Sequence, residues 1–111
     1  MRNFDVINTE MDESMTEVTK MELARMTINQ VDEELAKLFE RRMHAVEAIA
    51  AYKKENGLPI FDAKREEDNI ARNAELITDK NLKEFFVKWY QETMAVSRAY
   101  QKKILHIEDE Q

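Results

Sequence analysis

Hydrophobic and polar positions alternate along most of this chain with the spacing of amphipathic helices. The first seam runs from Arg25 to Lys53 in steps of three and four residues, which place every member on one side of a helix. Its members are Arg25, Ile28, Asp32, Leu35, Phe39, Arg42, Val46, Ile49 and Lys53. The pattern predicts one long helix over about residues 15–56, roughly 60 Å at the usual rise. A chain of this size offers little to cover so long a helix, and a second copy is the natural cover.

The ends of this helix have sequence signals of different strength. The run Asn-Gly-Leu-Pro at residues 56–59 predicts its end, because glycine can take the left-handed cap conformation and proline stops the helix from resuming. Asp12 or Ser14 is a candidate cap at its start, and Ser14 with Glu17 forms a capping box.

Two shorter helices follow. Asp62 is a good N-cap for a helix over about residues 63–77, and Thr78 with Asp79 separates it from a third helix over about residues 80–106. One stripe of the third helix contains Phe86, Tyr90, Met94, Ser97, Gln101 and Ile104. With one glycine and one proline in 111 residues, the chain has few positions for the turns of a sheet. We therefore expect an all-α fold of three helices per chain.

Composition limits the organisation and the partners. The length fits one domain, which we place at residues 15–108 between an acidic N-terminal tail at 1–14 and a frayed end at 109–111. The net charge of -6 argues against binding to nucleic acid or to an anionic membrane surface. Residues 1–20 contain no apolar run, so we expect neither a signal peptide nor a membrane anchor, and the absence of cysteine fits the cytoplasm.

Three cations on the long seam suggest a binding site for an anion. Buried charge is costly unless it is paired, and Arg25, Arg42 and Lys53 face a single acid, Asp32. Arg42 and Lys53 are about 16 Å apart along the helix axis and can reach one small molecule. Arg25 lies about 25 Å from Arg42, too far to share that molecule within one chain. An antiparallel partner helix would bring its own Arg25 to the site.

The start of the second helix adds both acceptors and a donor. Asp62 and Glu66 share a helix face, with Arg65 beside them. If this end folds back over Lys53, one pocket would hold Arg42, Lys53, Arg65 and the partner's Arg25 against Asp62 and Glu66. The surplus of two positive charges predicts a small dianion as ligand.

Taken in order, these polar positions resemble the signature of the all-helical chorismate mutases. The matching elements are Arg25 with Asp32, Glu-Arg-Arg-Met at 40–43, Lys53, Gly-Leu-Pro-Ile at 57–60, Asp62, Arg65-Glu66, Ser97 and Gln101. The resemblance spans about residues 21–103, and its ordered spacing is more specific than any single element. It implies an intertwined two-fold homodimer that converts chorismate to prephenate, on the route to phenylalanine and tyrosine, without a cofactor.

The resemblance also implies a role for each seam cation. Arg42 and the partner's Arg25 would bind the substrate carboxylates. Lys53 would bind a carboxylate and the ether oxygen, and Gln101 would donate to that same oxygen. A pericyclic rearrangement needs no nucleophile or general base, and the chain offers no convincing triad or metal cluster.

The remaining site residues would complete the shell around the substrate. Glu66 and Asp62 would hold the ring hydroxyl region, while Arg65 and Ser97 would complete the carboxylate contacts. The candidate catalytic residues are therefore Lys53, Gln101, Arg42 and Glu66. Neither histidine has neighbours at ligand spacing, so no metal site is predicted.

Two other functions stay open from sequence. An isochorismate pyruvate lyase would share the fold and similar cationic residues. A noncatalytic helical dimerisation or regulatory module would keep the fold without turnover.

Overall fold

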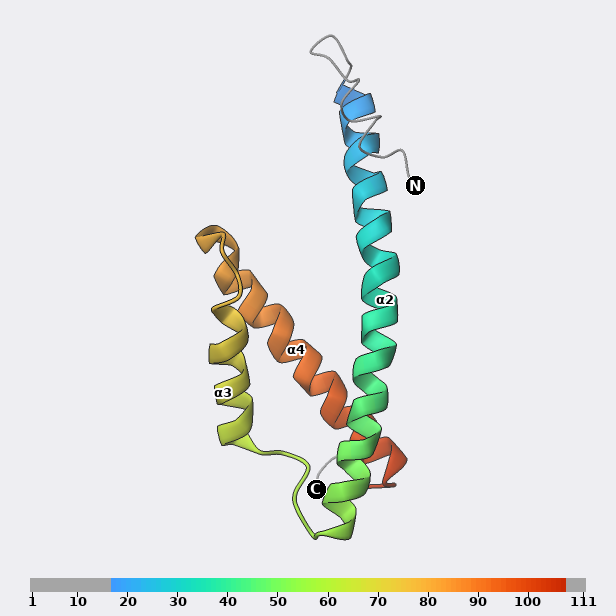
Figure 1. Ribbon diagram of the computed structural model, residues 1–111, viewed down its shortest axis with the longest axis vertical. Coiled ribbons are helices and arrows are strands. Elements are labelled where there is room, and N and C mark those ends of the chain that lie inside the picture. The colour runs from blue at the N-terminus through green and yellow to red at the C-terminus, as the bar shows by residue number, and fades with distance from the viewer. Residues whose placement is uncertain (1–16, 108–111) are drawn as a thin grey trace. The chain divides into compact units, whose positions relative to one another are not determined.

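The computed structural model describes residues 17–107, which contain three helices and no strand. The helices are α2 (Glu17–Glu55), α3 (Ala63–Ala74) and α4 (Lys80–Ile104) (Figure 1). The prediction of an all-α fold with one very long first helix is confirmed. The caps expected at Asp12 or Ser14 and both tails lie outside the described residues. The chain divides into two compact units after Arg41, within α2.

The described part of the first unit is the N-terminal portion of α2. No glycine or proline interrupts α2, whose sequence is rich in strong helix formers such as Ala, Leu, Glu and Met. Every residue from 24 to 41 is exposed, including Ile28 at 55%, Leu38 at 54% and Phe39 at 52%. This portion of the seam therefore buries none of its apolar side chains within the protomer.

The end of α2 forms in the second unit, at the predicted glycine. Gly57 has φ +63°, and its N–H donates to the Lys54 carbonyl at 3.4 Å. The N–H of Leu58 donates to the Lys53 carbonyl at 2.9 Å. These two bonds form a Schellman motif, which satisfies the last carbonyls of the helix and reverses the chain.

The start of α3 is as expected, but its end is not. Asp62 is the N-cap, and its Oδ1 accepts from the backbone N–H of Arg65 at 3.1 Å. The expected end at Ile77 is wrong, since α3 ends at Ala74. The N–H groups of Leu76 and Ile77 donate to carbonyls only three residues earlier, at 3.0 and 3.1 Å. This tighter turn brings the chain to the start of α4.

Both ends of α4 are capped. Asp79 has extended backbone, and its Oδ1 accepts from the N–H of Asn81 at 3.0 Å. The helix ends at Ile104, two residues before the expected end, because His106 takes a left-handed φ of 59°. The N–H of Ile107 then donates at 2.8 Å to the carbonyl five residues earlier, which makes a second Schellman motif.

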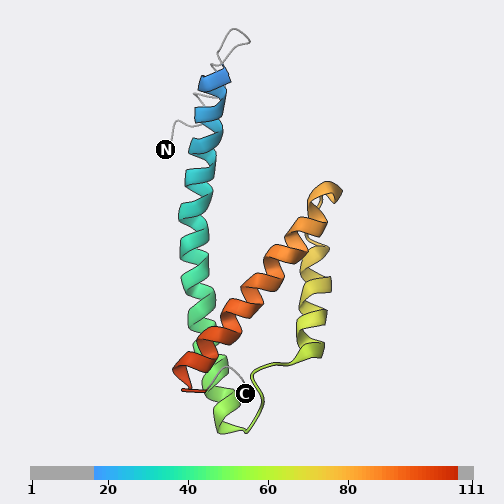
Figure 2. The same cartoon turned by 180° about the vertical axis from the view of Figure 1, so that it is seen from behind.

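Helices α3 and α4 lie side by side in the second unit (Figures 1 and 2). On α4, the rings of Phe86 and Tyr90 are stacked with centroids 5.7 Å apart. The Tyr90 hydroxyl accepts from Asn73 Nδ2 of α3 at 3.2 Å, which ties the two helices together.

The C-terminal portion of α2 packs against the later half of α4. Val46 and Ala50 of α2 and Met94 of α4 are the buried apolar residues of the described chain. Near them the Tyr100 hydroxyl of α4 donates to Glu47 of α2. The core is thus small, and the candidate site lies beside it.

Candidate functional site

Two polar side chains are buried among the described residues, Ser97 and Gln101 of α4, at 7% and 6% exposure. They lie four residues apart on one helix face, together with Met94. The Ser97 hydroxyl donates to the Thr93 carbonyl at 3.1 Å. In contrast, Gln101 Oε1 has no hydrogen-bond partner in the described chain. Buried polar atoms are normally paired, so an unpaired one beside a cavity is a candidate ligand contact.

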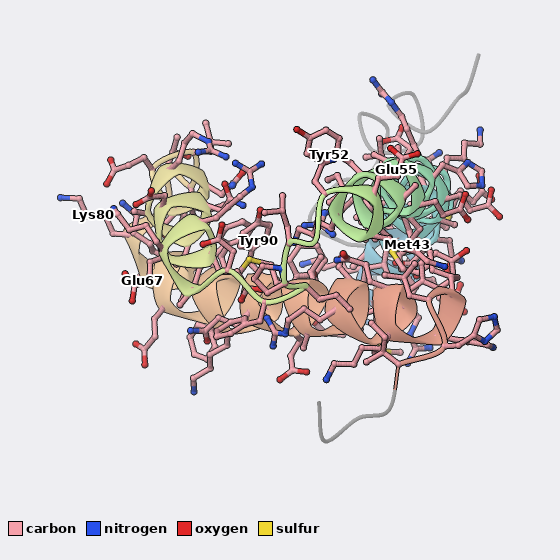
Figure 3. All side chains as sticks on the ribbon, turned by 90° about the horizontal axis from the view of Figure 1, so that it is seen from below. Met43, Tyr52, Glu55, Glu67, Lys80 and Tyr90 are labelled. Atoms are coloured by element: carbon pink, nitrogen blue, oxygen red, sulfur yellow. The ribbon has the colours of Figure 1, made fainter. Side chains whose placement is uncertain are left out.

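Arg42 points from α2 toward this face of α4. Its Nη1 donates a short hydrogen bond to Ser97 Oγ. Its Cζ also lies 5.9 Å from the centroid of the Tyr90 ring, which Figure 3 shows in the space between α3 and the end of α2. A guanidinium held by a hydroxyl and an aromatic face has little freedom, and its other N–H groups can bind an anion.

Lys53 reaches the site from the last turn of α2. Its Nζ donates to the Ile60 carbonyl at 2.7 Å. That carbonyl is within reach because the turn at Gly57 reverses the chain immediately after α2. An ammonium group has three donors, so two remain for a ligand.

Acidic groups enter from the start of α3. Asp62 uses Oδ1 to cap the helix. Glu66 accepts from Arg98 Nη1 of α4, which lies 2.5 Å from both carboxylate oxygens. The two side chains are 21% and 29% exposed, and the ion pair joins α3 to α4.

These side chains surround one cavity of about 150 Å³. Its charged and polar lining consists of Arg42, Lys53, Asp62, Arg65, Glu66, Asn69, Ser97, Arg98 and Gln101. The apolar lining consists of Val46, Ile49, Ile60 and Met94. Seven of the eight site residues predicted from sequence therefore meet at one place. The eighth, Arg25, is exposed on the N-terminal portion of α2, and its role stays a prediction.

Sequence reasoning missed two of the charged and polar lining residues, Asn69 and Arg98. Asn69 follows Asp62 and Glu66 at helical spacing, so the periodicity of α3 could have identified it. Arg98 lies next to Ser97 but off the predicted stripe, and its partner comes from another helix. Only the tertiary structure brings this pair together.

The cavity has the expected surplus of positive charge, but a different set of residues supplies it. Four cations, Arg42, Lys53, Arg65 and Arg98, face two carboxylates, Asp62 and Glu66. The surplus of two positive charges is thus present within one protomer. Arg25 is not needed to reach it, because Arg98 supplies the additional cation.

A larger cavity of about 810 Å³ adjoins this one and shares Lys53, Ile60 and Arg98 with it. The rest of its lining is Lys54, Gly57, Leu58, Pro59, Phe61, Lys102, Leu105 and Ile107. Arg98 therefore separates a polar cavity from a mainly apolar one.

The described residues offer neither a metal-binding cluster nor a membrane-spanning helix. Residues 17–107 contain no cluster of three or more His, Asp or Glu side chains that could hold a metal ion. None of the three helices is long and apolar enough to cross a membrane.

The chain matches the model of a known protein family. The family described as chorismate mutase type II matches residues 24–102, more than two thirds of the chain. The matched segment includes Arg25 and the entire cavity lining. Neither the curated proteins nor the solved structures include a significant match.

Proposed function

The chain belongs to the type II chorismate mutase family, an isomerase class, and on that premise we propose that it converts chorismate to prephenate by an intramolecular Claisen rearrangement. This reaction would serve phenylalanine and tyrosine biosynthesis. The observation that carries the proposal is the cavity whose walls gather Arg42, Lys53 and Gln101 with a positive surplus. Chorismate carries two carboxylates, so its charge complements that surplus.

The rearrangement breaks the ether bond between the ring and the enolpyruvyl side chain while a carbon–carbon bond forms between them. No proton moves and nothing leaves, so the enzyme needs no nucleophile. It must hold the side chain over the ring in the reactive chair-like shape, which charged anchors do by fixing the carboxylates. It must also stabilise the negative charge that grows on the ether oxygen.

Residues that line the cavity would perform both tasks, anchoring the carboxylates and stabilising the charge on the ether oxygen. Arg42, held by Ser97 and the Tyr90 ring, is placed to anchor a carboxylate. Lys53 has donors left after its bond to the Ile60 carbonyl, and it would bind a carboxylate and the ether oxygen. The Gln101 amide can present its NH₂ group to the same oxygen after rotation about its last side-chain bond. Two donors aimed at one developing charge lower the barrier.

The acidic side of the cavity would recognise the ring. Glu66 and Asp62 would accept from the ring hydroxyl, while Arg65 lines the same cavity and would support a carboxylate. Each assignment matches a donor on one partner with an acceptor on the other.

We further propose that the active form is a homodimer. The exposed apolar residues of the N-terminal portion of α2, such as Ile28 and Phe39, need a cover that the protomer does not provide. A second copy of α2 running antiparallel would cover them. It would also bring Arg25 of one chain to the cavity of the other, adding a third anchor for the substrate.

The activity is tested by the loss of chorismate ultraviolet absorbance with purified protein. Lys53→Ala should lower kcat/KM by roughly 100-fold or more, as expected for loss of a charge-stabilising donor. Lys88→Ala removes an exposed cation from α4 and should leave the rate unchanged. Product analysis decides between related reactions, since pyruvate and salicylate from isochorismate, with no prephenate from chorismate, would indicate a lyase. No turnover of either compound would indicate a noncatalytic module.

The shared site has its own test. Arg25→Ala and Lys53→Ala proteins, each expected to have lost most of its activity alone, are unfolded together and refolded. A hybrid dimer would then contain one intact site and recover activity. If Arg25 acted within its own chain, both sites of the hybrid would be defective, and the mixture would stay inactive.

A further inference from the structure

Arg98 forms an ion pair that joins α4 to α3 at the cavity. Its Nη1 lies 2.5 Å from both oxygens of Glu66, and the pair is about three-quarters buried, with exposures of 29% and 21%. Charge-assisted hydrogen bonds between a guanidinium and a carboxylate orient both groups. The carboxylate of Glu66 is therefore held in one place.

Arg98 is itself held from its other side. Its Cζ lies 5.1 Å from the centre of the Phe61 ring, a cation–π contact. The larger cavity beyond it is lined by the cations Lys54 and Lys102 and by apolar groups, without a carboxylate. In the described chain, Glu66 is accordingly the acid to which Arg98 hydrogen-bonds.

The position of Glu66 creates an electrostatic problem for a doubly negative substrate. Its carboxylate lines the small cavity, where it would repel the substrate carboxylates if it were unpaired. Paired with a guanidinium, the carboxylate keeps lone pairs that can accept from a hydroxyl, while its charge is balanced. The pair thus permits a hydroxyl acceptor inside an anion site.

We propose that Arg98 is a positioning residue, which orients Glu66 toward the ring hydroxyl of the substrate and cancels its repulsion of the dianion. This inference rests on the proposed function. It assigns Arg98 no contact with the reacting atoms, since its effect passes through Glu66. A lysine would keep the charge but has no planar guanidinium to lie over the Phe61 ring, so it should replace arginine only in part.

A double-mutant cycle tests the proposal, with kcat and KM for chorismate measured on four proteins: wild type, Arg98→Gln, Glu66→Gln and the double variant. Arg98→Gln leaves the Glu66 charge unbalanced and should raise KM about tenfold, with a smaller fall in kcat. In the Glu66→Gln background no charge remains to balance, and the same change should alter KM less than about twofold. Arg98→Lys should raise KM by roughly threefold.

Two controls separate positioning from a structural tie. Lys88→Gln removes one exposed positive charge from α4 and should leave KM unchanged, which excludes a general charge effect. Thermal unfolding of every variant confirms that each is folded at the assay temperature. If the ion pair served only to join the helices, Arg98→Gln and Glu66→Gln would break it equally. Arg98→Gln, which leaves the Glu66 carboxylate without its partner, would then raise KM no more than Glu66→Gln does.

The outcomes are distinguishable. Active wild type with equal, multiplicative effects of Arg98→Gln in both backgrounds overturns the positioning role alone. If the KM of Arg98→Gln equals that of the wild type, the positioning role is also overturned. A wild type that leaves chorismate unchanged overturns the proposed function, and this inference with it.

Discussion

Replacing Gln101 with methionine should stabilise the protein and remove most of its activity. Gln101 is 6% exposed, and its Oε1 has no hydrogen-bond partner in the described chain. An unpaired buried polar atom costs about 1–3 kcal/mol, because it has lost water without gaining a partner. Methionine has a similar length and volume, so it can fill the same space beside Met94 without that cost.

The two effects have different sizes. A net gain of about 1 kcal/mol would raise Tm by about 4–8 °C in a domain of this size. Loss of a donor to a developing negative charge costs roughly 100- to 1,000-fold in kcat. Function would thus be the reason for keeping an amide where an apolar side chain is more stable.

The measurements are thermal unfolding at one fixed protein concentration and chorismate consumption on the same samples. Gln91→Met, at an exposed position of α4, should change neither Tm nor kcat/KM and serves as the matched control. A lower Tm in Gln101→Met would show that the amide is well satisfied in the folded protein. An unchanged kcat/KM would show that it does not donate to the substrate.

Four further predictions concern the same site and the helix ends. Gln101→Glu should be active only as pH falls, because a carboxyl must be protonated to donate; a flat pH profile would contradict this. Gly57→Ala should destabilise the protein by about 1 kcal/mol in denaturant unfolding through its φ of +63° alone, since an added Cβ would meet no atom within 4 Å. His106→Gly should stabilise by about 0.5 kcal/mol, because His106 has a φ of 59° that glycine adopts without strain; a loss of stability would refute this. The hydrogen bond to Glu47 raises the pKa of Tyr100 above its ordinary 10.0, so the stabilisation it gives is present below that pH and lost as pH rises through the folded-state pKa. Tyr100→Phe should remove that alkaline loss in a series of unfolding measurements.

The helix boundaries that sequence predicted well depend on local chemistry. Gly57 takes the expected left-handed conformation and Asp62 caps α3 as expected, and each acts within a few residues of its own position. Asp79, predicted only to separate two helices, is the N-cap of α4. Helix α3 ends three residues before the predicted position. Leu76 and Ile77 continue the apolar pattern of the helix, but the pattern does not show that the chain must turn there to reach Asp79. Hydrophobic periodicity alone therefore does not predict where the turn between α3 and α4 begins.

Most of the candidate site could be predicted for a related reason, and the residue pair that was missed has a physical explanation too. Residues on one helix face keep their spacing whatever the tertiary structure, so Arg42 with Lys53 and Ser97 with Gln101 could be grouped from sequence. The pairing of Arg98 with Glu66 joins positions 32 residues apart on different helices. This pairing depends on tertiary packing, and it determines which cations supply the positive surplus of the cavity.

The polar residues of α4 explain why so small a core can support a site. Ser97 accepts from Arg42 of α2, and Arg98 donates to Glu66 of α3, so adjacent residues fix the two other walls of the cavity. Gln101, one turn further, is left without a partner for its oxygen. Groups that bind the walls cannot change partners without moving a helix, whereas Gln101 can turn toward a ligand at no such cost. The buried polar groups thus fall into those that hold the walls of the cavity and one, Gln101, that remains available within it. Under the proposed function, replacing Gln101 should lower the rate without lowering the stability of the protein, whereas replacing a group that holds a wall should lower both.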